Sequence, residues 1–271
     1  MPTHTDNGQM TFWQHLDELR YVLIRIIAVS ALFAIAAFVM KEQVFGILLA
    51  PQDSDFITYR WFEALGMLTG SESVEGFSIQ LISTALSAQF FIHIKTAAYV
   101  GLIAALPYTL LQIFRFLSPA LYSNERRNVV YATSSGYVMF MLGVAVCYFI
   151  IFPLTFRFLG TYQVSSGVEN MISIQSYIDT FITMTMLMGV MFELPVLCWL
   201  MSKAGMLTAS FMRRFRRHAA VLILAVAAII TPTADAFTMI AVAMPIYVLY
   251  ELSILIVALT TRSNKDLYYK Q

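Results

Sequence analysis

The carboxylate with the most informative position in this sequence is Glu193, which lies inside a long apolar run. If that run spans a membrane, a charged side chain at this depth costs about 2.5 to 3.5 kcal/mol and needs a partner or a neutral form. Pro195 follows, and because proline has no N–H, the carbonyl of Met191 loses its helical partner and a kink is predicted. The pair predicts a polar notch in mid-membrane. The alternative is a protonated glutamate satisfied within the chain's own helix bundle.

Two further carboxylates lie beside other apolar runs. Glu18 directly precedes the first of them, in a segment with apolar residues at helical spacing that predicts an amphipathic lead-in at the membrane interface. Glu125 follows Asn124, which can cap a helix, and so falls in a first turn where the helix dipole favours it. Either is also typical of a solvated helix residue, so residue type alone leaves both roles open.

Several chemistries have no support in the sequence. There is no GxxxxGK[ST] or GxGxxG nucleotide loop, no GxSxG nucleophile motif, and the four histidines are scattered without HExxH spacing. Cys147 and Cys198 lie in apolar runs and are interpreted as small core residues. The formal net charge of +1 gives no field that would attract nucleic acid. We therefore expect no metal site, no cofactor, no nucleic-acid partner and no enzymatic activity.

The composition predicts a membrane protein. Of the 271 residues, 59% are hydrophobic and 12% charged, against roughly 25% charged in a soluble domain. A helix needs about 20 apolar residues to cross the hydrocarbon core. We predict one membrane domain over residues 1–271, in which a lead-in at 8–20 precedes six spans, and the short fifth span is a half-depth helix paired with the sixth. The predicted spans cover about 21–40, 94–113, 129–152, 178–201, 219–230 and 237–259.

The distribution of basic residues orients the spans. An even number of crossings puts both termini on one side, and thirteen of the seventeen Lys and Arg fall on that side. By the positive-inside rule both termini are expected in the cytoplasm. The external side then carries two long connections, 41–93 and 157–177. Within the first of these, residues 79–92 alternate small and bulky side chains, which predicts a short amphipathic helix. The other four basic residues, all external, are Lys41, Arg60, Lys95 and Arg157.

Four blocks of residues, in this order along the six spans, resemble the TatC family, the multi-spanning core of the twin-arginine protein translocase. The resemblance covers nearly the whole chain and implies an all-α polytopic membrane protein with six transmembrane helices in a concave bundle. The blocks are His15-Leu16-Asp17-Glu18-Leu19-Arg20; Gln112 with Phe116-Leu117-Ser118-Pro119-Ala120-Leu121-Tyr122 and Glu125-Arg126-Arg127; Phe192-Glu193-Leu194-Pro195; and Thr231-Pro232 with Asp235-Ala236-Phe237 and Pro245.

The resemblance also implies roles for individual residues. Glu193 and Pro195 are expected at a mid-membrane position that faces partner subunits, so that the concave bundle exposes Glu193 to a partner helix. Pro51 and Asp235 match further family positions, of which Pro51 needs only a helix-turn role. The cytoplasmic site that reads the twin-arginine signal peptide is expected to contain Glu18, Arg20, Phe116, Pro119, Leu121, Glu125 and Arg127.

Physical reasoning supports a site with two carboxylates. In an extended peptide, consecutive side chains point to opposite faces, so two adjacent arginines cannot both pair with one carboxylate. We hypothesise that Glu18 and Glu125 each bind one arginine of the signal. A carboxylate can accept two parallel bonds from a guanidinium, and a lysine lacks that fork, which would explain a requirement for arginine.

The resulting hypothesis is a receptor and scaffold in the bacterial inner membrane, which binds signal peptides of folded proteins and works with TatA and TatB-type single-span subunits. The resemblance implies that the proton-motive force drives export and that the subunit associates with itself in the lipid bilayer. A proton-coupled secondary transporter, with Glu193 as the protonation site, is the alternative. We expect no matching broken segment for it, because Pro107 and Pro245 have no membrane carboxylate beside them. An intramembrane enzyme lacks a nucleophile and base at usable spacing.

Overall fold

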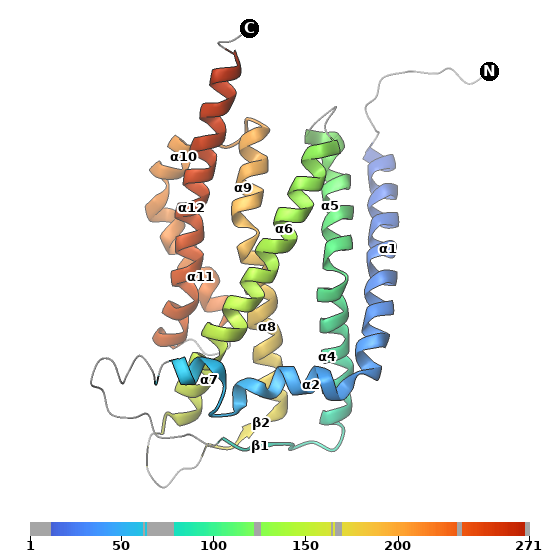
Figure 1. Cartoon of the computed structure of the whole chain (residues 1–271), viewed down its shortest axis with the longest axis vertical. Coiled ribbons are helices and arrows are strands. Elements are labelled where there is room, and N and C mark those ends of the chain that lie inside the picture. Colours follow the sequence, from blue (N-terminus) through green and yellow to red (C-terminus); the bar gives the residue numbers. More distant parts are fainter. Residues whose placement is uncertain are drawn as a thin grey trace, which may run out of the picture.

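The computed structural model describes residues 12–61, 63, 79–121, 126–163, 165, 170–231 and 235–268, and these are mostly helical. Most of the helices lie roughly along one axis, and α1 begins at the end of the bundle where α12 finishes, which we call the terminal end (Figure 1). The helices are α1 Phe12–Val39, α2 Lys41–Leu49, α4 Ala88–Ala104, α5 Leu106–Leu121, α6 Arg126–Val146, α7 Phe152–Thr161, α8 Ile174–Phe192, α9 Leu194–Lys203, α10 Ala209–Arg214, α11 Arg216–Ile230 and α12 Ala236–Tyr268.

Four helical stretches are long and apolar enough to cross a membrane: Leu16–Val39, Val130–Thr161, Ile174–Lys203 and Ala236–Thr260. The α4–α5 pair gives a fifth span if the bent pair is one crossing. The α11 helix has 15 residues, short of the length of a full span, and packs beside α12. The chain is thus a multi-pass membrane protein, and its short penultimate helix is paired with the last one, as the sequence predicts.

Proline residues interrupt two of the spans. Helix α8 ends at Phe192 and α9 begins at Leu194, so the break predicted beside Pro195 is confirmed. Helices α4 and α5 meet at a 57° bend at Ala105, two residues before Pro107. The expectation that no second span is broken is therefore wrong. Since proline lacks the N–H that a helix needs, no carboxylate is required for a break. Pro245, in contrast, lies inside the continuous helix α12.

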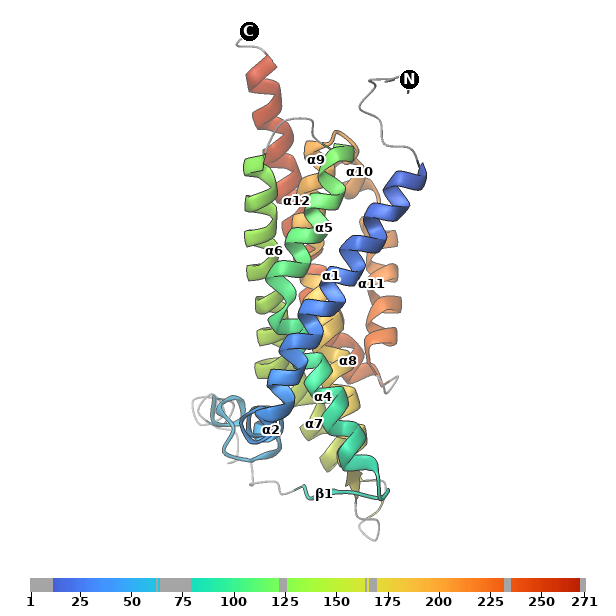
Figure 2. The ribbon, with the colours of Figure 1, turned by 90° about the vertical axis from the view of Figure 1, so that its right-hand side faces the viewer.

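Two helix seams depend on glycines. Between α1 and α4, a Cβ added to Gly101 would stand 2.5 Å from the backbone nitrogen of Ala34. Between α6 and α8, one added to Gly189 would stand 2.6 Å from the Phe140 ring. Such small residues let helices in a membrane approach closely. Helix α1 runs obliquely along α4 and α5 (Figure 2) and is otherwise little covered, since only 11% of its apolar window is buried.

The end opposite the termini is covered by residues 41–61, 148–163 and 170–177, which we call the cap (Figure 1). Helix α2 lies across the bundle axis there (Figure 1) and continues into the short 3-10 helix Ala50–Gln52. The buried Tyr59 hydroxyl lies 3.0 Å from the carbonyl oxygens of both Pro51 and Pro153. The Tyr177 hydroxyl donates to the carbonyl of Leu48 at 2.9 Å. Tyrosine hydroxyls thus pair with carbonyls at the end of α2, in the 3-10 helix that follows it and in the first turn of α7.

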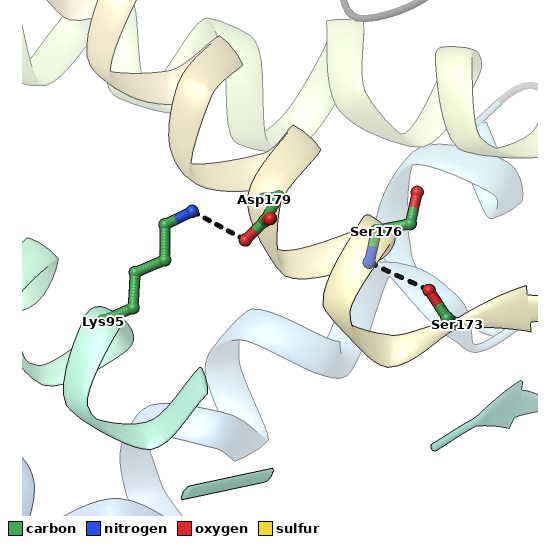
Figure 3. A network of polar contacts seen from close by, with 4 residues as sticks. All are labelled: Lys95, Ser173, Ser176 and Asp179. Atoms are coloured by element: carbon green, nitrogen blue, oxygen red, sulfur yellow. Dashed lines mark hydrogen bonds and ion pairs between the residues drawn. The ribbon is translucent and has the colours of Figure 1, made fainter. Parts of the chain in front are cut away.

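The segment predicted as an amphipathic helix at 79–92 is only partly helical. Strand β1, Leu81–Ile82, pairs in parallel with β2, Ile172–Ser173, and α4 begins at Ala88. The helix prediction is wrong before Ala88 because a strand distant in the sequence supplies the partner for the backbone. Ser173 also caps α8, its hydroxyl accepting from the Ser176 N–H at 3.2 Å (Figure 3).

One ion pair joins α4 to α8 near the cap. The Lys95 ammonium lies 2.7 Å from the Asp179 carboxylate, and both side chains are exposed (Figure 3). Exposed pairs of this kind contribute little to stability.

Candidate functional site

A pocket of about 460 Å³ opens between α1 and α5, towards the terminal end. It combines two carboxylates, two guanidinium groups, an amide, a phenol and two apolar side chains. The residues that line it are Asp17, Glu18, Tyr21, Val22, Arg25, Gln112, Arg115 and Phe116.

Helical spacing places these side chains in two rows. On α1, Glu18, Val22 and Arg25 follow one another by one turn, and on α5 Gln112 and Phe116 do the same. Val22 is 8% exposed and Gln112 7% exposed, so they lie at the seam where the two helices pack. The charged side chains reach outward from this seam, where water or a bound segment can contact them.

The arrangement suits a peptide with both charged and apolar residues. The Glu18 side chain is half-buried, whereas Asp17 beside it is exposed. A carboxylate held partly out of water forms a stronger pair with a guanidinium than an exposed one does. Phe116, half-buried across the pocket, offers an apolar surface beside that carboxylate. Among the described residues no group of three His, Cys, Asp or Glu could hold a metal ion.

The structure brings together some of the residues predicted for the signal-peptide site. Glu18 and Phe116 line the pocket, while Arg20 is exposed and does not line it. Glu125 lies outside the described residues. The other three occupy described helices, but their side chains lie outside the described part of the chain: Pro119 and Leu121 in α5, and Arg127 in α6.

Sequence reasoning did not assign the remaining lining residues to the site. The signal was present in the spacing, because positions three, four and seven after Glu18 lie near its face of a helix. What the sequence did not show is that α5 packs against this stretch of α1. The residues missed are Asp17, Tyr21, Val22, Arg25, Gln112 and Arg115.

Glu193 lies at the break between α8 and α9 and is 8% exposed. Both carboxylate oxygens are buried, and within the described residues neither has a hydrogen-bond partner. They lie 3.0 and 3.3 Å from where a Cβ on Gly136 of α6 would stand, and Leu110 of α5 packs at the same point. The expectation that the bundle exposes Glu193 is wrong for this chain alone, because α5 and α6 cover the carboxylate.

The two other family positions have structural roles in the described chain. Pro51 is buried in the cap, where its carbonyl accepts from Tyr59. Asp235 directly precedes α12 and accepts from the Thr238 N–H at 2.8 Å and from its hydroxyl at 2.5 Å. That geometry is an N-cap, and it stabilises the start of the last helix.

Comparison with known proteins identifies relatives over most of the chain. Residues 14–245 match the family model described as "Sec-independent protein translocase protein (TatC)". The protein named "Sec-independent protein translocase protein TatC" of Blattabacterium sp. subsp. Periplaneta americana is 32% identical over 261 residues, covering 93% of this chain and 96% of the relative. The protein of the same name from Aquifex aeolicus is 33% identical over 259 residues, covering 95% and 99%.

Two solved structures share the fold. One, titled "Crystal Structure of Twin Arginine Translocase Receptor- TatC", matches with a TM-score of 0.73 and 33% identity over 91% of this chain and 99% of that one. A second crystal structure of the receptor, in DDM, matches with a TM-score of 0.72 over 89% and 98%. The predicted fold class, an all-helical bundle with the six-helix architecture of these proteins, is confirmed.

Proposed function

The chain belongs to the TatC family of Sec-independent protein translocase proteins, and we propose that it is the core receptor subunit that binds twin-arginine signal peptides of folded proteins for export. The observation that carries this proposal is the pocket between α1 and α5, where a half-buried carboxylate, Glu18, lies beside the apolar surface of Phe116. As a component of a translocase, the family supplies a transport receptor rather than a catalyst.

Recognition follows from the extended shape of a signal peptide. Glu18 binds the guanidinium of one arginine in a two-bond pair, and the adjacent arginine points the other way. Glu125, four residues beyond the end of α5, binds that second arginine. Arg25 and Arg115 line the same pocket and balance the charge of Asp17 and Glu18. A cation therefore gains little from the pocket's net charge and must form the geometrically specific pair.

Assembly with TatA and TatB-type subunits is a separate part of the proposal, with Glu193 and Pro195 as the contact in mid-membrane. A partner helix reaches the carboxylate only after α5 or α6 shifts, because Gly136 and Leu110 cover it. A polar group on the partner would then provide the hydrogen bond that Glu193 lacks within the described residues. The subunit also associates with itself, both termini face the cytoplasm of a bacterial inner membrane, and the proton-motive force drives transport.

The transporter alternative has one observation in its favour. A secondary transporter uses broken spans in its two halves, and the chain breaks at Ala105 as well as at Glu193. The first break carries no ionisable side chain, since Ala105 and Leu106 are both buried hydrophobic residues. Uptake of a small solute by the purified protein alone would favour this alternative over the receptor.

Photocrosslinking in membranes tests the receptor function. A probe at Tyr21, inside the pocket, is compared with a matched probe at Ile47, which is exposed on α2 in the cap. We expect the probe at Tyr21 to form adducts with a labelled Arg-Arg precursor and not with its Lys-Lys variant, and Ile47 to form none. Glu18→Gln should abolish the adduct, whereas Asp17→Asn should leave most of it. Equal adducts with the two precursors would contradict the proposal.

Partner contact is tested with the same membranes. Glu193→Gln should weaken co-purification of the single-span subunits and leave the Arg-Arg adduct at Tyr21 unchanged. Loss of the adduct with partner association intact would reverse the roles assigned to the two sites.

A further inference from the structure

A second cavity, of about 420 Å³, lies away from the peptide pocket, on the opposite part of the bundle. Its lining comes from α6, α9 and α12, and α9 is visible between the other two helices in Figure 1. We call it the α9 groove. Its lining residues are Tyr131, Ser135, Met139, Pro195, Val196, Trp199 and Ile256.

The α9 groove offers almost no polar contact. Ser135 is a small polar residue in the lining, and its hydroxyl already donates to the carbonyl of Tyr131, on the same helix, at 2.7 Å. The other side chains are aromatic, branched or thioether groups. No charged side chain lines the groove, and its polar side-chain atoms are limited to the Ser135 hydroxyl, the Tyr131 phenol and the Trp199 N–H, so it suits a mostly apolar occupant within the membrane.

Pro195, at the mid-membrane end of the groove, belongs to the proposed partner contact, but the rest of the lining argues against a transmembrane helix as the occupant. Helices pack in membranes through rows of small residues or through interhelical hydrogen bonds. The α9 groove has bulky residues such as Met139, Trp199 and Ile256 along its walls, and Ser135 uses its hydrogen bond within α6. A flexible acyl chain fills an irregular groove of this kind without needing either feature.

A positive charge marks one end of the α9 groove. The Lys203 ammonium lies over the Trp199 ring, 4.6 Å from its centroid. Lys203 is the last residue of α9, one turn beyond Trp199, which is where a bilayer interface holds lysine and tryptophan side chains. Basic side chains between spans at an interface attract anionic lipid headgroups.

We propose that the α9 groove holds an acyl chain of an anionic phospholipid whose headgroup is bound by Lys203. The lipid occupies the leaflet at the terminal end of the bundle. Because acyl chains of all lipids are equally apolar, selection among lipids comes from the headgroup charge alone. The expected preference for an anionic over a zwitterionic lipid is about fivefold, which corresponds to about 1 kcal/mol for one basic residue near the surface.

The experiment uses Trp199 as its own reporter. The chain has three tryptophans, so Trp13→Phe and Trp61→Phe leave Trp199 alone in the full-length protein. The protein is reconstituted into vesicles that contain increasing fractions of phosphatidylglycerol or phosphatidylcholine brominated on the acyl chain, and quenching of Trp199 fluorescence is measured. We expect half-maximal quenching at about a fivefold lower fraction of the brominated phosphatidylglycerol.

Variants separate the groove from bulk lipid. Lys203→Gln should remove the fivefold preference and Lys203→Arg should retain it, which shows that the charge and not the fold is responsible. Arg213→Gln, a matched control that removes an exposed cation from α10, should have no effect. Ser135→Leu, which fills the groove, should reduce quenching by both lipids.

Three outcomes would overturn the proposal. Equal quenching by the two lipids in the parent protein would mean that the headgroup is not recognised. Quenching that is insensitive to Ser135→Leu would mean that Trp199 reports bulk lipid. Absence of quenching by either lipid would mean that protein, and not lipid, covers the groove.

Discussion

The two ends of the bundle are built on opposite principles. In the cap, buried tyrosines donate to backbone carbonyls: Tyr59 to Pro51 and Pro153, and Tyr177 to Leu48. The pocket near the terminal end is lined by charged side chains that are mostly exposed. The cap pairs its buried tyrosine hydroxyls internally and leaves the buried Thr155 hydroxyl without a partner among the described residues, whereas the pocket keeps its charged groups mostly exposed. We therefore expect changes in the cap to act mainly on stability and changes in the pocket mainly on recognition.

The change with the largest expected effect disturbs both ends together. Gly101→Leu forces α1 away from α4, since a Cβ there meets the backbone of Ala34 at 2.5 Å. Helix α1 carries half of the pocket and leads into α2 of the cap. We therefore expect the free energy of unfolding to fall by about 3 kcal/mol or more, and the peptide adduct to be lost. Thermal unfolding in detergent and crosslinking at Tyr21 measure the two effects.

Gly46→Leu is the matched control for that change. Nothing lies within 4 Å of a Cβ added to Gly46 on α2, so stability and adduct should stay close to those of the parent. If Gly101→Leu were as mild as Gly46→Leu, the α1–α4 seam would not connect the two ends.

Truncation in the cap should cost stability and spare peptide binding. Tyr59 is 2% exposed, so Tyr59→Ala should cost about 3 to 5 kcal/mol, and Tyr59→Phe, which removes only the hydroxyl, about 1 to 3 kcal/mol. The adduct at Tyr21 should persist in both variants at a temperature where they remain folded. A loss of adduct in folded Tyr59→Phe would show that the cap acts on the pocket.

The same tyrosine gives the cap a dependence on alkaline pH. Burial raises the pKa of Tyr59, and nearby Arg157 opposes that shift. Because the folded-state pKa is the higher one, the stabilisation is complete below the ordinary tyrosine pKa and is lost as the pH rises towards the folded value. The melting temperature of the parent should therefore fall above about pH 10, and more steeply than that of Tyr59→Phe.

Charge removal in the pocket should spare stability and change peptide binding. Arg25→Gln and Arg115→Gln alter exposed side chains, so each should change stability by no more than about 0.5 kcal/mol. Each leaves the pocket with a net negative charge, which should raise binding of the Lys-Lys precursor about two- to fivefold and so reduce discrimination against it. Competition with unlabelled peptide measures this; unchanged discrimination in both variants would mean that these arginines do not balance the carboxylates.

A small effect on stability is also expected at the ion pair between α4 and α8. Lys95 and Asp179 are both exposed, so Lys95→Gln should cost less than about 1 kcal/mol. The cost should shrink in high salt, which screens exposed pairs. A double-mutant cycle with Asp179→Asn measures the coupling energy of the pair. A coupling energy well above about 1 kcal/mol would mean that the pair contributes to stability, as the buried tyrosines of the cap are expected to do.

The local consequences of proline could be predicted only in part. The break beside Pro195 was predicted from the N–H that proline lacks, which removes the helical partner of the Met191 carbonyl. The continuity of the last span through Pro245 was predicted too, whereas the bend before Pro107 was not. All three prolines lack the same donor, so the difference comes from how neighbouring helices pack on each turn, which the sequence does not show.

The apolar spans, their order and the family follow from the sequence alone, because membrane insertion selects on hydropathy and the family blocks are local. The sequence also indicated Glu18 and Phe116 as site residues. The folded structure was needed to show that Arg25 and Arg115 share their pocket, that Glu193 is buried against α6, and that β1 pairs with a strand about 90 residues away. Those contacts join segments distant in the chain, and helix spacing fixes which residues share a face but not which helix that face meets.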